Sequence, residues 1–181
     1  TLGTGSPPAW TAVGSGIDSS VSAIKINADG TIYIGGAFTT AGGNSNCNNI
    51  AKKSLNDNNW LPLANGLNSA VREMKFHPNG NLIIGGSFTD ADGANGDYIC
   101  WWDGSSFKSF TSLGATELST YGYINTIDIT QNGTIIIGGS FTNAGGDPNA
   151  DYVAAWRGNN WGALSAGGVN DSVRDINCTD N

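Results

Sequence analysis

The feature that most constrains this chain is a five-residue sequence that occurs three times at nearly equal intervals. It consists of Gly-Gly, then Ala or Ser, then Phe-Thr, and its copies begin at Gly35, Gly85 and Gly138. The copies are 50 and 53 residues apart. Self-similarity at a period of roughly 20–50 residues is typical of repeat architectures in which one supersecondary unit is stacked several times. The chain is therefore predicted to consist of one such unit repeated.

Each repeat begins with two alternating apolar stretches joined by a short turn. The first stretches span 21–26, 71–76 and 124–129, and the second stretches lead into the Gly-Gly pairs. The turns between them are Asp29-Gly30, Asn79-Gly80 and Asn132-Gly133. Asp, Asn and Gly tolerate the positive φ angles that a two-residue hairpin turn requires. We therefore expect a tight β-hairpin at the start of every repeat.

Two further short strands are expected to complete each unit. The third contains Ile50, Ile99 or Val153, and the fourth opens with an aromatic residue, which is Trp60, Phe107 or Trp161. A four-stranded antiparallel unit of about 50 residues in tandem is a β-propeller blade. The prediction is an all-β chain forming a single propeller region over residues 1–181. Its complete blades span 21–63, 71–113 and 124–164, with partial blades at 10–13 and 173–181.

The partial blades lead to a further expectation about the extent of the protein. Residues 10–13 repeat the last strand of a unit, and residues 173–178 repeat the first strand. Closed propellers have roughly four to eight blades. We therefore expect the chain to be a fragment of a larger propeller or part of a larger assembly. The alternative is closure by self-association of several copies.

Charge and hydropathy exclude several classes of protein. The formal net charge is −7, with only eight Lys and Arg residues to neutralise phosphates, so nucleic acid is not an expected partner. Charged residues make up 13% of the chain, about half of the usual ~25%, which argues against a salt-bridged helical bundle. No apolar run approaches the ~18 residues of a membrane helix, and we expect no membrane insertion.

The combined repeat pattern resembles a known family. The pattern is Val-x-x-Ile-x-Ile, Asp/Asn-Gly, Ile-x-Ile-Gly-Gly-x-Phe-Thr, Ile-Ala and Trp-x-x-Leu, as in residues 21–63. It resembles the delta-sixty-type β-propeller repeats of bacterial secreted, surface and phage tail proteins, and more distantly those of fungal cortical-polarity membrane proteins. The resemblance implies a binding or spacer module on the cell surface, in the extracellular space or on a virion, and it supplies no catalytic residue.

Residue types suited to catalysis are scarce. The chain has a single histidine, His77, in a predicted turn whose polarity accounts for it. Its three cysteines are not spaced like metal ligands. We therefore expect no enzymatic activity. A glycan-active enzyme, which would need two carboxyl groups at a defined separation, is the third and least favoured hypothesis.

A calcium ion is the one cofactor that the sequence suggests. Asp90, Asp92, Asn95 and Asp97 place hard oxygen ligands at short spacing in the loop between the second and third strands of the middle repeat. The alternative is that these side chains stabilise the turns of the loop by hydrogen bonds to its backbone.

Three aromatic residues are candidates for ligand binding. The counterparts of Trp101 in the other repeats are Lys52 and Ala155, which indicates a partly solvent-facing position. Tyr121 and Tyr123 lie in or beside a stretch present in only one repeat. Exposed aromatic rings with amide neighbours are suited to sugar recognition, because they combine stacking with hydrogen bonds.

The leading hypothesis is a non-catalytic module of the adhesin or phage tail fibre type. Its expected partner is a cell-surface polysaccharide or protein, and carbohydrate binding is the favoured activity. The alternative is a structural spacer or building block of a fibre, sheath or capsid decoration.

Overall fold

The computed structural model describes residues 15–95, 98–110, 118, 122–166 and 168–179. The described residues form three four-stranded antiparallel sheets, here called blades 1, 2 and 3. Blade 1 contains β1 (Val21–Ile26), β2 (Thr31–Gly36), β3 (Ile50–Ser54) and β4 (Leu61–Pro62). Blade 2 contains β5 (Val71–Phe76), β6 (Leu82–Gly86), β9 (Ile99–Trp102) and β10 (Phe107–Ser109). Blade 3 contains β11 (Ile124–Ile129), β12 (Ile135–Gly139), β13 (Val153–Trp156) and β14 (Trp161–Gly162).

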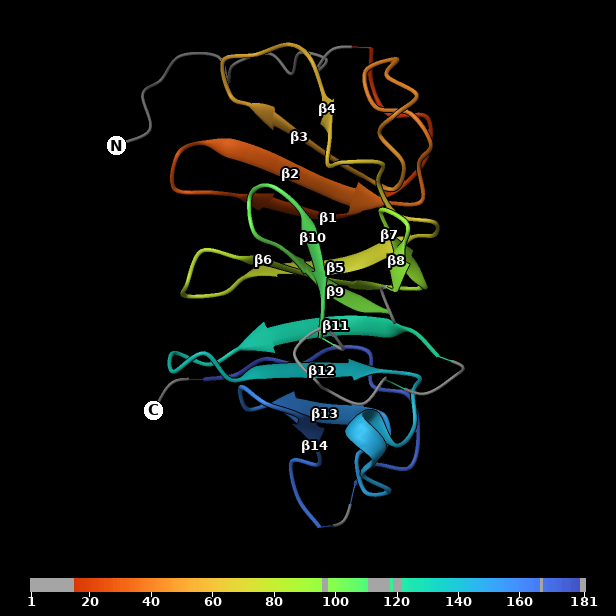
Figure 1. The fold of residues 1–181 in the computed structure, drawn as a ribbon, viewed down its shortest axis with the longest axis vertical. Coiled ribbons are helices and arrows are strands. Elements are labelled where there is room, and N and C mark those ends of the chain that lie inside the picture. The colour runs from red at the N-terminus through yellow and green to blue at the C-terminus, as the bar shows by residue number, and fades with distance from the viewer. Residues whose placement is uncertain (1–14, 96–97, 111–117, 119–121, 167, 180–181) are drawn as a thin grey trace, which may run out of the picture.

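The predicted all-β architecture of propeller blades is thereby confirmed. The blades follow one another along the long axis of the molecule, and their first hairpin turns all lie on one side (Figure 1). The connections between the second and third strands lie on the opposite side. Two of these connections contain small elements that the sequence pattern does not predict. They are the hairpin of β7 (Asp90–Ala91) and β8 (Ala94–Asn95), and the 3₁₀ turn η2 (Ala144–Gly146).

The described part of the chain has no helix long and apolar enough to cross a membrane.

The Phe-Thr end of the repeated sequence anchors each blade. Phe38, Phe88 and Phe141 are at most 1% exposed. In blades 1 and 2, the threonine of the repeated sequence forms hydrogen bonds with a polar residue that lies just before the first strand of the same blade. Thr39 donates through its N–H and its hydroxyl to the Asp18 carboxylate, and Thr89 exchanges two hydrogen bonds with the Asn68 amide. Phe therefore fills the core, while Thr holds the start of the hairpin.

The second glycine of each pair allows close approach within its own blade. The first strand of each blade has a register shift near its start, which brings its backbone against the second strand. A Cβ atom at Gly36, Gly86 or Gly139 would overlap the backbone carbonyl oxygen of the residue just before that strand. Only glycine fits this position, since the obstructing atom belongs to the main chain.

The first glycine of each pair makes the contact between neighbouring blades. A Cβ atom on Gly35 would lie 2.5 Å from Val71 Cγ1 of blade 2, and one on Gly85 would lie 2.7 Å from Ile124 Cγ2 of blade 3. Blades 2 and 3 thus each pack the first apolar side chain of their first strand directly onto a glycine of the preceding blade. We call this packing the inter-blade glycine contact.

Residues 173–178 make the same contact with blade 3. A Cβ atom on Gly138 would lie 2.6 Å from Val173 Cγ1. The segment therefore lies where the repeat predicts a further first strand, but it does not form one, because the described residues contain no second strand with which it could pair. The other predicted partial blade, 10–13, lies outside the described residues.

Polar contacts add to this stacking of first strands. Lys25 forms an ion pair with Glu73 across blades 1 and 2, and Lys75 forms one with Asp128 across blades 2 and 3. Asp128 is 5% exposed and also accepts a hydrogen bond from the N–H of Cys178. Burial alone would raise the pKa of the Asp128 carboxyl, but this hydrogen bond and Lys75 lower the pKa below its ordinary value of 3.8.

We expect Gly86→Ala to lower the free energy of unfolding by about 3 kcal/mol or more, because the added methyl group meets main-chain atoms that cannot rotate away. Gly162→Ala is the matched control, since a Cβ atom there makes only ordinary van der Waals contacts. Chemical denaturation of both variants checks the difference. Equal stability of the two variants would contradict this role of the glycine.

We expect Asp128→Asn to lower the free energy of unfolding by about 1–3 kcal/mol at neutral pH, through loss of a charged acceptor. A carboxyl whose pKa is lowered by folding stabilises the protein above its unfolded pKa, and this stabilisation is lost as the pH falls through the folded pKa. The difference between the wild type and Asp128→Asn should therefore shrink when denaturation is repeated well below pH 3.8. A difference that stayed constant with pH would show that the carboxylate charge is not responsible.

Candidate functional site

A pocket of about 460 Å³ lies between blades 2 and 3, and we call it the inter-blade pocket. Three aromatic rings form its wall: Trp101 of β9, Phe110 just after β10, and Trp156 at the end of β13. The centroid of the Phe110 ring lies 4.8 Å from that of Trp101 and 5.0 Å from that of Trp156, in edge-to-face packing. This packing fixes the orientation of the rings, so the aromatic wall is formed before any ligand arrives.

The rim of the inter-blade pocket is polar. The first hairpin turns of blades 2 and 3 contribute most of it, and Arg157 follows β13. The rim side chains are those of His77, Asn79, Asn81, Asn132, Thr134 and Arg157. Amides and hydroxyls both donate and accept hydrogen bonds, so the rim is suited to a ligand with many hydroxyl groups.

His77 connects the two turns of the rim. Its Nε2 lies 3.0 Å from the carbonyl oxygen of Gly133, which can only accept, while its Nδ1 accepts a hydrogen bond from the N–H of Asn79. These partners correspond to the tautomer with its proton on Nε2. Nε2 therefore connects the turns of blades 2 and 3, while Nδ1 bonds within the turn of blade 2.

At two positions, the junction that contains the pocket has smaller side chains than the junction of blades 1 and 2. There, Tyr33 and Phe76 pack edge to face with their centroids 5.8 Å apart. The corresponding residues between blades 2 and 3 are Ile83 and Ile129. Two isoleucines leave free the volume that two aromatic rings fill, since the backbone spacing is set by the same glycine contact at both junctions.

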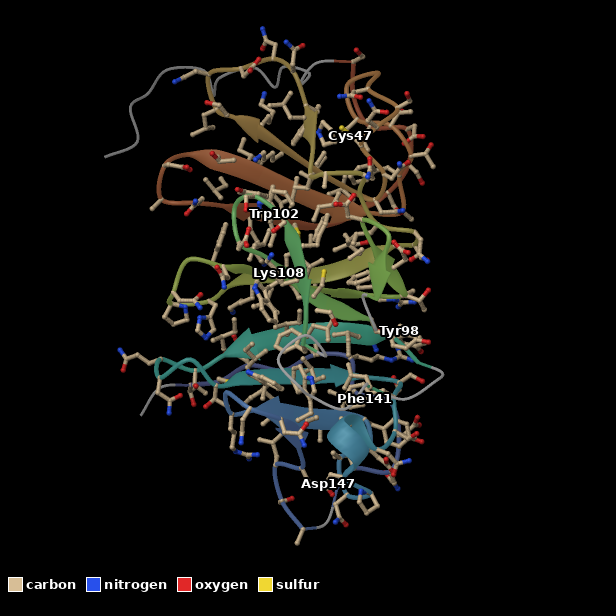
Figure 2. The ribbon with its side chains drawn as sticks, viewed as in Figure 1. Cys47, Tyr98, Trp102, Lys108, Phe141 and Asp147 are labelled. Carbon is tan, nitrogen blue, oxygen red and sulfur yellow. The ribbon has the colours of Figure 1, made fainter. Side chains whose placement is uncertain are left out.

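A second difference between the junctions lies on the third strand. Lys52 of blade 1 extends over the ring of Trp102 in blade 2, with its Nζ 5.5 Å from the ring centroid. Trp102 is labelled in Figure 2, between the first two sheets. In blade 2, Trp101 occupies the register position that Lys52 has in blade 1, and it faces the junction with blade 3. A flat aromatic surface thus replaces a charged chain at the junction that contains the pocket.

The three predicted ligand-binding aromatic residues do not lie together in one site. Trp101 is half-buried and lines the inter-blade pocket. Tyr123 directly precedes β11, whereas the pocket lies at the end of β11 that leads into the hairpin turn. The ring of Tyr123 packs under the Arg72 guanidinium, 4.2 Å from its centroid, and lines a separate cavity. Tyr121 lies outside the described residues.

Three of the four predicted calcium ligands, Asp90, Asp92 and Asn95, lie in the β7–β8 hairpin, where Asp90 pairs with Asn95 in the ladder. The Asp90 carboxylate accepts a hydrogen bond from the N–H of Gly93, and the Asp92 carboxylate accepts two from Asn65. The Asp90 carboxylate thus stabilises its own loop, as the alternative interpretation expects, whereas the Asp92 carboxylate connects the loop to the segment that contains Asn65. Among the described residues, no three His, Cys, Asp or Glu side chains gather as metal ligands. Asp97 lies outside that part of the chain, so calcium binding stays a prediction.

Phe110 and the rim of the pocket are not among the predicted site residues. Phe110 has the register position of Leu63 and Leu164 in the other repeats, so a change of residue type marks it. Arg157 and Asn132 carry no comparable signal, because Gly, Asn and charged residues are ordinary in turns. Only the stacking of blades brings these turns to one pocket.

The stacked four-stranded sheets and the pocket between two of them define a β-propeller domain, a class of repeat protein that serves as a binding or structural module. The chain belongs to the Rax2 C-terminal beta propeller domain family, whose family model matches residues 4–180. This match confirms the predicted propeller repeats, and the more specific assignment to the delta-sixty type stays a prediction. A comparison with curated protein sequences finds no match to the chain.

Proposed function

We propose that this propeller is a non-catalytic module that binds surface carbohydrate at the inter-blade pocket. The observation that carries the proposal is the half-buried Trp101 ring on the wall of a pocket whose rim consists mainly of amide and hydroxyl groups. The faces of sugar rings stack on aromatic rings, and their hydroxyl groups exchange hydrogen bonds with amides. The pocket volume of about 460 Å³ falls within the range of roughly 300–1,000 Å³ that is usual for small-ligand sites.

The residues of the pocket support binding rather than hydrolysis. Among the described residues that line it, none is Asp or Glu. Glycoside hydrolysis ordinarily uses two carboxyl groups on either side of the scissile bond. Both ring nitrogens of His77 already have partners, since Nε2 bonds to Gly133 of the next turn and Nδ1 to Asn79 of its own turn. We therefore propose that a bound sugar is held and released unchanged.

The proposed setting is the outside of a cell or the surface of a virion, with an adhesin or a phage tail fibre as the type of protein. The resemblance to delta-sixty-type repeats and the low charged fraction of 13% support this setting. A sheet surface rich in Asn, Gly and Thr depends on backbone ladders rather than on ion pairs, and so it tolerates changes of salt concentration.

A structural role is the second candidate, and one observation favours it. Ile24 and Ile26 on β1 are 58% and 59% exposed, although the corresponding residues of β5 and β11 pack against a neighbouring blade. An exposed apolar strand face of this kind is suited to contact with another β-surface. A spacer or building block of a fibre, sheath or capsid decoration would use such a contact.

The test of carbohydrate binding begins with a panel of immobilised bacterial and fungal surface polysaccharides, followed by calorimetry with an oligosaccharide of the best binder. We expect Trp101→Ala to weaken binding at least about tenfold, which corresponds to ~1.4 kcal/mol. Lys52→Ala is the matched control, because Lys52 has the same register position in blade 1 and should leave affinity unchanged.

A second variant separates the pocket from the stability of the fold. Ile83→Tyr restores the ring that Tyr33 supplies at the other junction, so it should fill the pocket and weaken binding without loss of thermal stability. Wild-type affinity in both Trp101→Ala and Ile83→Tyr would exclude this pocket as the site. Failure of the wild type to bind any polysaccharide would overturn the carbohydrate function and favour the structural role.

A further inference from the structure

A second cavity, of about 710 Å³, lies where the first strands of the blades begin, and we call it the polar pocket. We propose that the polar pocket binds the anionic group of an acidic saccharide, either a carboxylate or a sulfate ester. The inference rests on different residues from the inter-blade pocket, which lies at the opposite ends of the same strands.

The repeat itself creates the polar pocket. The second residue of each first strand lies beside its counterpart in the next blade, because the blades stack in the same register. These counterparts are Ser22 of β1, Arg72 of β5, Asn125 of β11 and Arg174 of the 173–178 segment, and all four line the pocket. One register position thus forms a row of hydrogen-bonding side chains across four segments.

Arg72 is held in a fixed orientation within this row. Its Nε donates to the hydroxyl of Ser87 at 3.1 Å, and its Nη1 donates to Oδ1 of Asn125 at 3.1 Å. The guanidinium plane also lies over the ring of Tyr123. A guanidinium fixed in this way loses little conformational entropy when a ligand binds, which favours affinity.

Arg174 lies exposed on another wall of the pocket and has no hydrogen bond or ion pair to any residue that the structure describes. The chain contains only three arginines, so two of the three line this one cavity. Asp171 is the one carboxylate among the described residues of the pocket, and it accepts a hydrogen bond from the N–H of Ser172. Two guanidinium groups against one carboxylate leave the pocket cationic in a chain whose net charge is −7.

This arrangement matches a particular ligand chemistry. Guanidinium groups bind carboxylate and sulfate oxygens through paired, charge-assisted hydrogen bonds. The hydroxyls of Ser22 and Ser172 lie around the same cavity and are suited to the hydroxyl groups of a sugar ring, whereas the Asn125 amide already accepts from Arg72 and donates to the carbonyl oxygen of Val173. A uronic acid or a sulfated sugar presents both kinds of group together, which a simple anion does not.

The three arginines allow a direct experiment on the wild-type chain. Each arginine gives one Nε–Hε resonance in ¹H–¹⁵N NMR spectra, and Arg157 lines the inter-blade pocket. We expect glucuronate or glucose 6-sulfate at millimolar concentration to shift the resonances of Arg72 and Arg174, whereas a shift of the Arg157 resonance reports a sugar in the inter-blade pocket. The preferred probe distinguishes carboxylate from sulfate recognition.

Glucose and acetate are the control probes for this titration. Glucose should leave the Arg72 and Arg174 resonances in place, and acetate should bind at least about tenfold more weakly than glucuronate. Equal binding of acetate and glucuronate would overturn the assignment to a saccharide. Absence of any shift at Arg72 and Arg174 with both acidic sugars would overturn the anion site itself.

Variants then locate the site independently of the carbohydrate function proposed for the inter-blade pocket. Arg174→Gln should reduce the affinity for the acidic sugar at least about tenfold and leave the fold intact, because the side chain is exposed and has no described partner. Lys108→Gln is the matched control, because Lys108 is an exposed cation that lines neither pocket, and it should bind the acidic sugar like the wild type. Wild-type affinity in Arg174→Gln would contradict the proposal, whatever the result for Trp101→Ala.

Discussion

The contact of an apolar side chain with a bare glycine is the interaction on which the rest of this structure depends. Val71 on Gly35, Ile124 on Gly85 and Val173 on Gly138 set the spacing and the register between successive first strands. A side chain at the first glycine would force the blades apart, and one at the second would collide with the main chain of its own hairpin. The Gly-Gly pair therefore links the geometry within a blade to the geometry between blades.

A fixed spacing makes each junction sensitive to the size of the side chains around the contact. Between blades 1 and 2, Tyr33 and Phe76 fill the space, whereas Ile83 and Ile129 leave a pocket at the next junction. At the opposite strand ends, the same register brings Arg72 beside Asn125 and produces a polar cavity. Side chains that differ between repeats, on a backbone whose spacing is constant, thus produce two cavities of different chemistry. One cavity has an aromatic wall, and the other contains two arginines.

Much of the fold was predictable, since it follows from local rules that repeat. The Asn-Gly and Asp-Gly turns, the alternating apolar residues and the recurring Gly-Gly-x-Phe-Thr sequence specify four-stranded blades without tertiary information. The site was only partly predictable. Trp101 stood out because its counterparts are Lys52 and Ala155, and the structure places it in a pocket. Tyr123 stood out because it lies beside a stretch present in only one repeat, but it packs under Arg72 in a different cavity.

The sequence by itself determined the class of fold and the three copies of a four-stranded unit. Hydrogen-bond ladders and alternating burial act between near neighbours along the chain, so their pattern is visible in one dimension. Only the tertiary structure decided which turns of different blades meet, as in the contact between His77 and Gly133. It also decided that Asp128 forms an ion pair with Lys75 and accepts a hydrogen bond from the N–H of Cys178. These contacts join residues about 50 positions apart, and they depend on the stacking of whole sheets rather than on any local preference.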